Sequence, residues 1–270
     1  MPAGRALAAA RGTSDIGWAG LAGSLGLVAV AIALSAFRRL ALERSMAWAA
    51  LRALVQLLAV GAVLGFVIDP ARPLVFSWLW VAAMVVVASL TVRSRAREVP
   101  GALPLALVAC AAGTVVSLGV LFGLRVFPLE AKAVIPLAGL TIGNTMSAAV
   151  VASRRIVGEL SDKRDEVEAR LALGKPWPEA ARPYIRSALR TALLPQIETT
   201  KAVGLVALPG AMTGLILAGV RPIDAVRIQA AVMYVVLGSV ATSVTVISLG
   251  LARRLFTPDH RLLPLRRPAG

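Results

Sequence analysis

The chain has 270 residues, of which 58% are hydrophobic and 16% charged, and its mean hydropathy is +0.79. This composition excludes a disordered chain, a coiled coil and most soluble enzymes. A single cysteine, Cys110, and a single histidine, His260, exclude a disulfide framework and most imidazole chemistry. The net charge of +15 comes from basic residues placed between apolar runs, where they set membrane topology rather than bind nucleic acid. The sequence therefore predicts an integral membrane protein.

Seven apolar runs are long enough to cross about 30 Å of hydrocarbon as helices. They cover residues 18–37, 46–68, 74–92, 101–124, 133–152, 202–220 and 228–252. Helices are expected because lipid cannot satisfy backbone N–H and C=O groups. The first run is too long for the apolar part of a secretory signal and is interpreted as a retained span. The predicted fold is an all-α, polytopic transmembrane bundle of about seven spans, a single domain over residues 1–270.

Lysine and arginine counts indicate how the spans are oriented. The connecting segments fall into two alternating sets: one holds 21 basic residues and the other seven. The richer set comprises 38–45, 93–100, 153–201 and 253–270. The positive-inside rule places this set in the cytoplasm, with the N-terminus outside and the C-terminus inside. Arg52 falls within a span, about 9 Å from its cytoplasmic end, where its side chain is expected to snorkel to the interface.

The connection over residues 153–201 is the long one, and it is expected to be cytoplasmic. It holds ten basic residues and seven of the 14 acidic residues. A simple positive-inside tether needs no acids, so the segment is predicted to fold, with helices over 159–173, ended by Gly174, and over 183–194, ended by Pro195. Their short apolar ridges fit helices lying on lipid headgroups and also fit a docking element for a cytosolic partner.

Residues 168–174, Glu-Ala-Arg-Leu-Ala-Leu-Gly, resemble the start of the EAA loop of bacterial ABC-transporter permeases. In that family this short helix sits in a groove of the ATPase subunit and passes on its motion. Further blocks are similar in order and spacing to the FetB-type iron-export permeases. These blocks lie at 143–149, 166–174, 208–214, 216–219 and 225–229. Leu215 departs from the pattern, because that family commonly has glutamine after Met-Thr-Gly. If that glutamine contacts the substrate, the resemblance does not carry the substrate over to this chain.

The resemblance implies the permease subunit of an ABC transporter in the bacterial cytoplasmic (inner) membrane, exporting a metal ion, iron. It implies two copies of the chain paired with a separate FetA-type ATPase, which binds the ATP, so that no cofactor belongs to this chain. Plant relatives of this branch act in aluminium tolerance, so the transported species is not uniform across it. The residues that the resemblance assigns to ATPase coupling are Glu168, Ala169, Leu171 and Gly174.

The energy source can also be considered from the residues alone. No G-x-x-x-x-G-K-[ST] phosphate loop occurs, since Gly174-Lys175 is followed by Pro176, so the chain is not expected to hydrolyse ATP itself. The apolar runs hold no carboxylate, which argues against proton coupling. Two alternatives stay open: a gradient-driven secondary transporter, and a membrane scaffold that recruits a cytosolic protein without transport.

A second group of residues is predicted to form a substrate path or hinge. An amide in hydrocarbon must find a partner, and a Pro-Gly pair inside a span frees backbone carbonyls. The candidates are Asn144, Thr145, Met146, Pro209, Gly210, Met212, Thr213 and Gln229. Stripes of Ser and Thr equally fit helix packing. A tight Fe²⁺ site would need histidines and carboxylates, which the spans do not offer, so the metal ligands are left unassigned.

Overall fold

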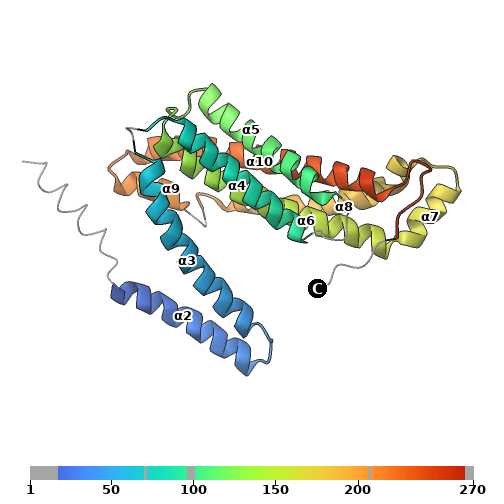
Figure 1. Cartoon of the computed structure of the whole chain (residues 1–270), viewed down its shortest axis with the longest axis horizontal. Coiled ribbons are helices and arrows are strands. Elements are labelled where there is room, and N and C mark those ends of the chain that lie inside the picture. The colour runs from blue at the N-terminus through green and yellow to red at the C-terminus, as the bar shows by residue number, and fades with distance from the viewer. Residues whose placement is uncertain (1–17, 70–71, 96–100, 206–207, 265–270) are drawn as a thin grey trace, which may run out of the picture. The chain divides into compact units, whose positions relative to one another are not determined.

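The computed structural model describes residues 18–69, 72–95, 101–205 and 208–264. In these ranges the chain is helical apart from turns and one isolated antiparallel bridge between Phe256 and Leu262. The helices are α2 (Trp18–Phe37), α3 (Glu43–Val67), α4 (Val75–Arg95), α5 (Ala102–Gly123), α6 (Ala131–Asp162), α7 (Arg164–Ala172), α8 (Trp177–Ala202), α9 (Gly210–Leu217) and α10 (Pro222–Leu255) (Figure 1). The all-α prediction is confirmed for this part of the chain.

The chain forms two compact units, residues 1–67 and 68–270. In the first unit α2 packs against α3 across a short turn. Arg39 and Ala41 adopt left-handed backbone conformations in this turn, and the Ser35 hydroxyl donates a 2.8 Å hydrogen bond to the Glu43 carboxylate across it. The turn therefore has a polar clip, whereas both helices carry mostly apolar, exposed side chains.

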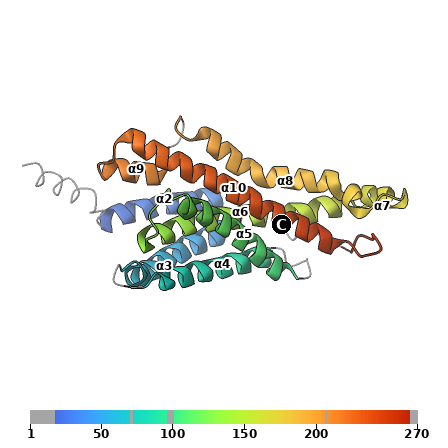
Figure 2. The same cartoon turned by 90° about the horizontal axis from the view of Figure 1, so that it is seen from above.

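In the second unit, α10 packs against α5, α6, α8 and α9, while α4 packs against α5 and α6 (Figure 2). The longest helices are α6 with 32 residues and α10 with 34, which at the helical rise reach about 48 and 51 Å. Both exceed the thickness of the bilayer core, so each extends well beyond any membrane it crosses.

Small residues allow α5, α6 and α10 to approach closely in the middle of this unit. A Cβ atom added to Gly113 would lie 2.9 Å from Cγ2 of Thr145 and 3.0 Å from the Ser239 carbonyl oxygen. Hydroxyls here bond to their own helices: Thr145 donates to the Ile142 carbonyl at 3.0 Å, and Ser239 donates to the Val236 carbonyl at 2.9 Å. These contacts are those of helix packing in a membrane, where short side chains bring backbones together.

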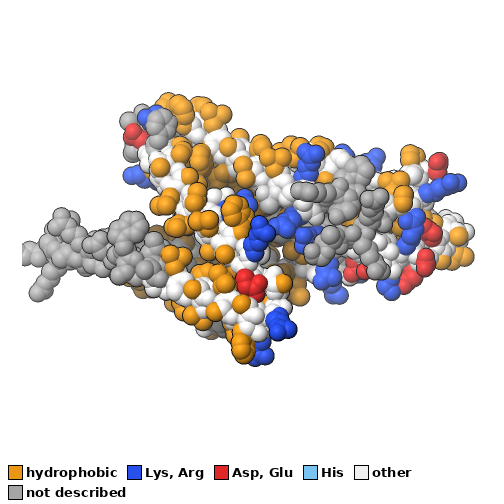
Figure 3. All heavy atoms as spheres, turned by 60° about the horizontal axis from the view of Figure 1, so that its bottom comes forward, with side chains coloured by type: hydrophobic (Ala, Val, Ile, Leu, Met, Phe, Trp, Pro, Cys, Tyr) orange, Lys and Arg blue, Asp and Glu red, His pale blue; other side chains and the backbone are white. Residues whose placement is uncertain are grey.

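Helices α3, α4, α5, α6 and α10 are long and apolar enough to cross a membrane. The outer surfaces of α4 and α5 are apolar, with Leu79, Val87 and Val115 each 60% exposed or more. Figure 3 shows many acidic and basic side chains at the end where α7 lies, hydrophobic side chains over the helices next to it, and further charged side chains elsewhere on this face. Apolar flanks beside a charged end are what a membrane-spanning bundle requires where it meets water.

The structure differs from the sequence predictions after residue 158. The helix expected over 159–173 is divided at Lys163, and the one expected over 183–194 extends over 177–202. Pro195 does not end α8, because the helix packs on both α6 and α10, and this burial offsets the roughly 3 kcal/mol cost of an interior proline. The apolar run at 202–220 does not form one helix, and α9, with eight residues, spans only about 12 Å.

Candidate functional site

Helix α7 lies beyond the end of α6 and is bounded by two sharp changes of direction. Lys163 separates it from α6, and Asp165 and Glu166 occupy its first turn, where they complement the positive end of the helix dipole. At its other end Gly174 has a φ of +81°, and its N–H donates to the Leu171 carbonyl at 2.9 Å. A left-handed glycine of this kind ends a helix without the steric cost that other residues incur.

The inner side of α7 is fixed to α8. Val167 is fully buried, and Leu171 packs against the hydrophobic core. The Tyr184 hydroxyl donates a 2.8 Å hydrogen bond to Oε2 of Glu166, and the Arg170 guanidinium lies over the Tyr184 ring, 5.6 Å from its centre. One aromatic side chain of α8 therefore contacts two successive turns of α7.

The residues after α10 hold α7 and α8 from another side. The Arg164 guanidinium donates to the carbonyl oxygens of Leu262 and Leu263 at 3.2 and 3.3 Å, and its Nε donates to Glu168 at 2.6 Å. Trp177 stacks on Phe256, with ring centres 5.3 Å apart and planes 19° from parallel, and the backbone N–H of Trp177 donates to Nδ1 of His260 at 3.2 Å. We name the assembly of α7, residues 173–187 and residues 256–264 the α7 tip.

Charge also stabilises the α7 tip. A hydrogen bond from the Lys163 ammonium, 2.7 Å long, lowers the pKa of the Glu166 carboxyl, and the Tyr184 hydroxyl lowers it further. The same bond raises the pKa of Lys163. Burial raises the pKa of Tyr184, with a further increase from its bond to Glu166. Each of these groups therefore keeps its bonding protonation state at neutral pH.

The outer side of the α7 tip is where a partner could bind. Of the residues predicted for coupling, Glu168, Ala169 and Gly174 are exposed, while Leu171 is half-buried and faces the core. Leu173 was not predicted, and its side chain is 80% exposed directly after α7. The sequence does contain a signal for this exposure. Leu173 is apolar, but its position on the helix is not on the face that Val167 and Leu171 share and bury. Leu173 is therefore an apolar side chain open to solvent on the outer side of the α7 tip.

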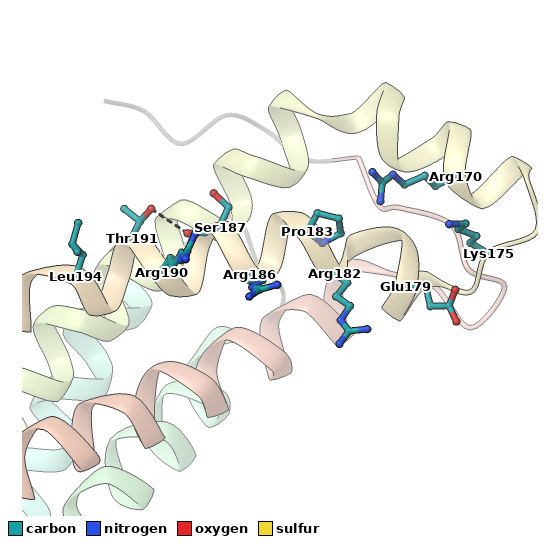
Figure 4. A pocket seen from close by; sticks show the side chains of 10 residues that line it. All are labelled: Arg170, Lys175, Glu179, Arg182, Pro183, Arg186, Ser187, Arg190, Thr191 and Leu194. Carbon is teal, nitrogen blue, oxygen red and sulfur yellow. Dashed lines mark hydrogen bonds between the residues drawn. The ribbon is translucent and has the colours of Figure 1, made fainter. Parts of the chain in front are cut away.

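A groove runs beside the α7 tip along the outer face of α8 (Figure 4). Arg182, Arg186 and Arg190 project from successive turns of α8, and Arg170 and Lys175 lie at its α7 end. Glu179 is the acidic residue among those that line it. The groove is therefore strongly basic. Its three arginines are four residues apart in the sequence, which places them on one face of the helix.

The path residues predicted on α6 do not share one environment. Asn144 is half-buried and donates to the Leu140 carbonyl of its own helix at 2.7 Å. Thr145 is fully buried at the contact with Gly113, and Met146 packs against the core. Thus Thr145 lies in the helix packing, and the amide of Asn144 makes one hydrogen bond within its own helix.

The remaining path residues lie near the other end of α10. Pro209 directly precedes α9, while Gly210, Met212 and Thr213 belong to its first turn. Helix α9 packs against α10, in which Gln229 is 5% exposed. Gln229 is about 15 Å along α10 from Ser239, the residue near Thr145, so the structure does not bring the two predicted groups together. In the described ranges, no three His, Cys, Asp or Glu side chains gather in a way that could hold a metal ion.

Comparison with known proteins gives a consistent result. Residues 18–256 match the family described as "Uncharacterised protein family (UPF0014)". The chain is 40% identical to "UPF0014 membrane protein STAR2" of Oryza sativa subsp. japonica over 219 residues, which is 80% of this chain and 76% of the relative. It is 34% identical to "Protein ALUMINUM SENSITIVE 3" of Arabidopsis thaliana, over 82% of this chain and 81% of the relative.

A bacterial relative covers still more of the chain. "Probable iron export permease protein FetB" of Escherichia coli (strain K12) is 31% identical over 248 residues, which is 90% of this chain and 93% of the relative. No solved structure matches the chain.

Proposed function

Because this chain belongs to the UPF0014 family of membrane proteins, we propose that it is the permease subunit of an ABC transporter that exports a metal ion, iron. Membership of this family, which it shares with FetB, confirms the resemblance found in the sequence. The proposal adds that a separate FetA-type ATPase binds and hydrolyses the ATP, that two permease copies assemble, and that the complex lies in the bacterial cytoplasmic membrane.

The observation that carries the proposal is the form of the α7 tip. Its inner side is fixed by Val167, Tyr184 and Arg164, whereas Ala169 and Leu173 are exposed on its outer side. A subunit that is displaced by a motor needs a contact element that does not deform by itself. A short helix fixed to α6, α8 and the residues after α10 meets this need, because force applied to it reaches all three.

The binding of an ATPase can be tested with one pair of variants. Leu173→Asp places a charge at the centre of the proposed contact, while Leu129→Asp changes a leucine that is 50% exposed between α5 and α6. We expect Leu173→Asp to lower co-purification of a co-produced FetA-type ATPase at least tenfold and Leu129→Asp to leave it unchanged. Undiminished association of Leu173→Asp, or no association of the parent chain, would overturn the proposal.

Transport provides a second measurement on the same element. Glu168→Lys breaks the ion pair with Arg164, and Gly174→Pro cannot adopt the left-handed conformation at that position. Both variants are expected to insert normally and to lose ATP-dependent metal export. Export that persists without any ATPase would instead indicate a gradient-driven carrier, and partner binding with no flux would indicate a scaffold.

A further inference from the structure

The outer face of α8 carries charged residues at both of its ends, unlike the outer faces of α4 and α5. Its inner residues, such as Ala181, Ala188 and Ala192, are buried where the helix packs on α6 and α10. Arg182, Arg186 and Arg190 are exposed toward the start of the helix and Glu198, Thr199 and Lys201 toward its end, with the exposed Leu194 and Pro195 between the two groups. Helix α8 is thus packed like a bundle helix, but lipid cannot solvate the polar group at its C-terminal end.

Contacts between α8 and α6 give the depth of this face. Tyr184 bonds to Glu166 of α7, and three residues later Ser187 donates to Glu159 of α6 at 3.1 Å, so α8 runs back along α6 in the direction opposite to the chain. Glu198 lies about 16 Å beyond Ser187 at the helical rise, which brings it level with Ala148 of α6. In Figures 1 and 2 the C-terminal end of α8 likewise lies alongside α10.

This level falls about 6 Å inside the apolar run 133–152, counted from the end expected to face the cytoplasm. Ala148 is buried in the run 133–152, and Thr145, one turn away, lies at the contact of α5, α6 and α10. The carboxylate of Glu198 and the ammonium of Lys201 form a 2.9 Å ion pair there, with 56% and 67% of their side chains exposed. The seven apolar runs contain no Asp or Glu, so Glu198 supplies a carboxylate at a depth where those runs supply none.

We infer that the outer face of α8 between Glu198 and Lys201 lines the cytoplasmic part of a water-filled path through the membrane, and that Glu198 contacts the cationic cargo. Charged side chains at bilayer depth lie against protein or a water-filled cavity. The opposite wall is the same face of a second copy, since a twofold contact brings identical surfaces together. Each copy contributes one acid and one base at this level, so the paired faces stay neutral. The cargo and the second copy rest on the proposed function.

The ion pair gives this site a simple means of exchange. Without cargo, Lys201 neutralises Glu198 and prevents an unpaired carboxylate from facing the path. A divalent cation carries twice the charge of the ammonium and competes with it for the carboxylate. Because the lysine stem is flexible and largely exposed, the ammonium can move into the water when the cation binds and return when it leaves.

Thiol labelling tests where this face lies. The chain has one cysteine, the buried Cys110, so Cys110→Ala provides a cysteine-free background. Single variants Thr199→Cys, Arg182→Cys and Val115→Cys then sample the path, the solvated end of the same helix and the apolar face of α5. A membrane-impermeant maleimide is applied to intact cells producing the whole transporter and to inside-out vesicles.

Each labelling pattern decides the inference. We expect Thr199→Cys to react in intact cells, Arg182→Cys to react only in inside-out vesicles, and Val115→Cys to react at least tenfold more slowly in both. If Thr199→Cys reacts only where Arg182→Cys does, α8 lies outside the membrane and the inference is wrong. If it is as unreactive as Val115→Cys, the face contacts lipid or protein and the inference is equally wrong.

The role of Glu198 is tested by metal export. Glu198→Gln keeps the size of the side chain and removes its charge, and Glu130→Gln makes the same change at an exposed residue before α6. We expect Glu198→Gln to lower export at least tenfold while membrane insertion and ATPase association stay at parental levels, and Glu130→Gln to export normally. Equal export by both variants would overturn the assignment. Loss of ATPase association by the parent would overturn the proposed function instead, and the labelling result would still stand.

Discussion

The core of the bundle and the α7 tip are both contacts between helices, but they are built from different groups. In the core, α5, α6 and α10 meet at Gly113, Thr145 and Ser239, and no large side chain separates the backbones. In the α7 tip, the contacts are the long side chains of Arg164 and Trp177, which reach segments far away in the sequence. We therefore expect the core to be sensitive to added volume and the tip to lost charge or lost aromatic area.

The largest effect is expected from added volume in the core. Gly113→Leu must separate α5 from the Ser239 backbone and the Thr145 side chain, and we expect it to cost about 3 kcal/mol of stability. Gly119→Leu, on the same helix, is the matched control, since no neighbouring heavy atom would lie within 4 Å of a Cβ atom added to Gly119. Thermal unfolding of both variants in detergent measures the difference, and equal melting temperatures would show that the core accommodates volume.

A smaller and local effect is expected from lost aromatic area in the tip. Trp177→Ala removes the stack on Phe256 and should destabilise the α7 tip by about 2 kcal/mol while leaving the bundle folded. Limited proteolysis in detergent should cut residues 256–264 at least tenfold faster than in the parent. Trp48→Ala, at a 62% exposed tryptophan of the first unit, serves as the control. If cleavage at 256–264 is unchanged, the stack does not hold the segment.

The smallest effect is expected from charge, and it depends on pH. The pKa of Glu166 is lowered in the folded chain, so its contribution to stability is present above the ordinary glutamate pKa of about 4.3 and is lost as the pH falls through the lowered value. Glu166→Gln should thus increase hydrogen exchange in α7 relative to the parent at pH 7, and this difference should shrink as the pH is lowered and the parent carboxyl becomes protonated. Asp165→Asn, next to it on the exposed side of α7, should give a smaller change. A difference that stays constant as the pH is lowered until the parent carboxyl is protonated would mean that the charge is not its cause.

The sequence predicts the core better than the tip, for a physical reason. Apolar runs such as 18–37 and 101–124 correspond closely to α2 and α5, because the bilayer selects on length and hydropathy, which are local properties. Length and hydropathy did not identify the C-terminal part of α8 as a helix that packs in the bundle. Its buried face consists of alanines, and Glu198 and Lys201 give it the composition of a solvated loop.

The tip could be located but not assembled from the sequence. Residues 168–174 marked α7, yet nothing local indicates that Trp177 stacks on Phe256 or that Arg164 binds the carbonyls of residues 262 and 263, since these pairs are separated by about eighty to a hundred positions. The hinge at Pro209-Gly210 was placed inside a span, whereas in the structure Pro209 caps a short separate helix. From the sequence alone, a proline at this position fits both a kink inside a continuous helix and the start of a new helix.

The continuity of α10 has a mechanical consequence. This helix runs without interruption from Pro222 to Leu255, packs against α9 near its start, and is followed directly by the residues that hold Trp177 and Arg164. A rod of this kind conveys axial and tilting displacements from one extremity to the other, with no hinge to absorb them. Movement imposed on α7 therefore has a direct route to α9, roughly 50 Å away at the helical rise.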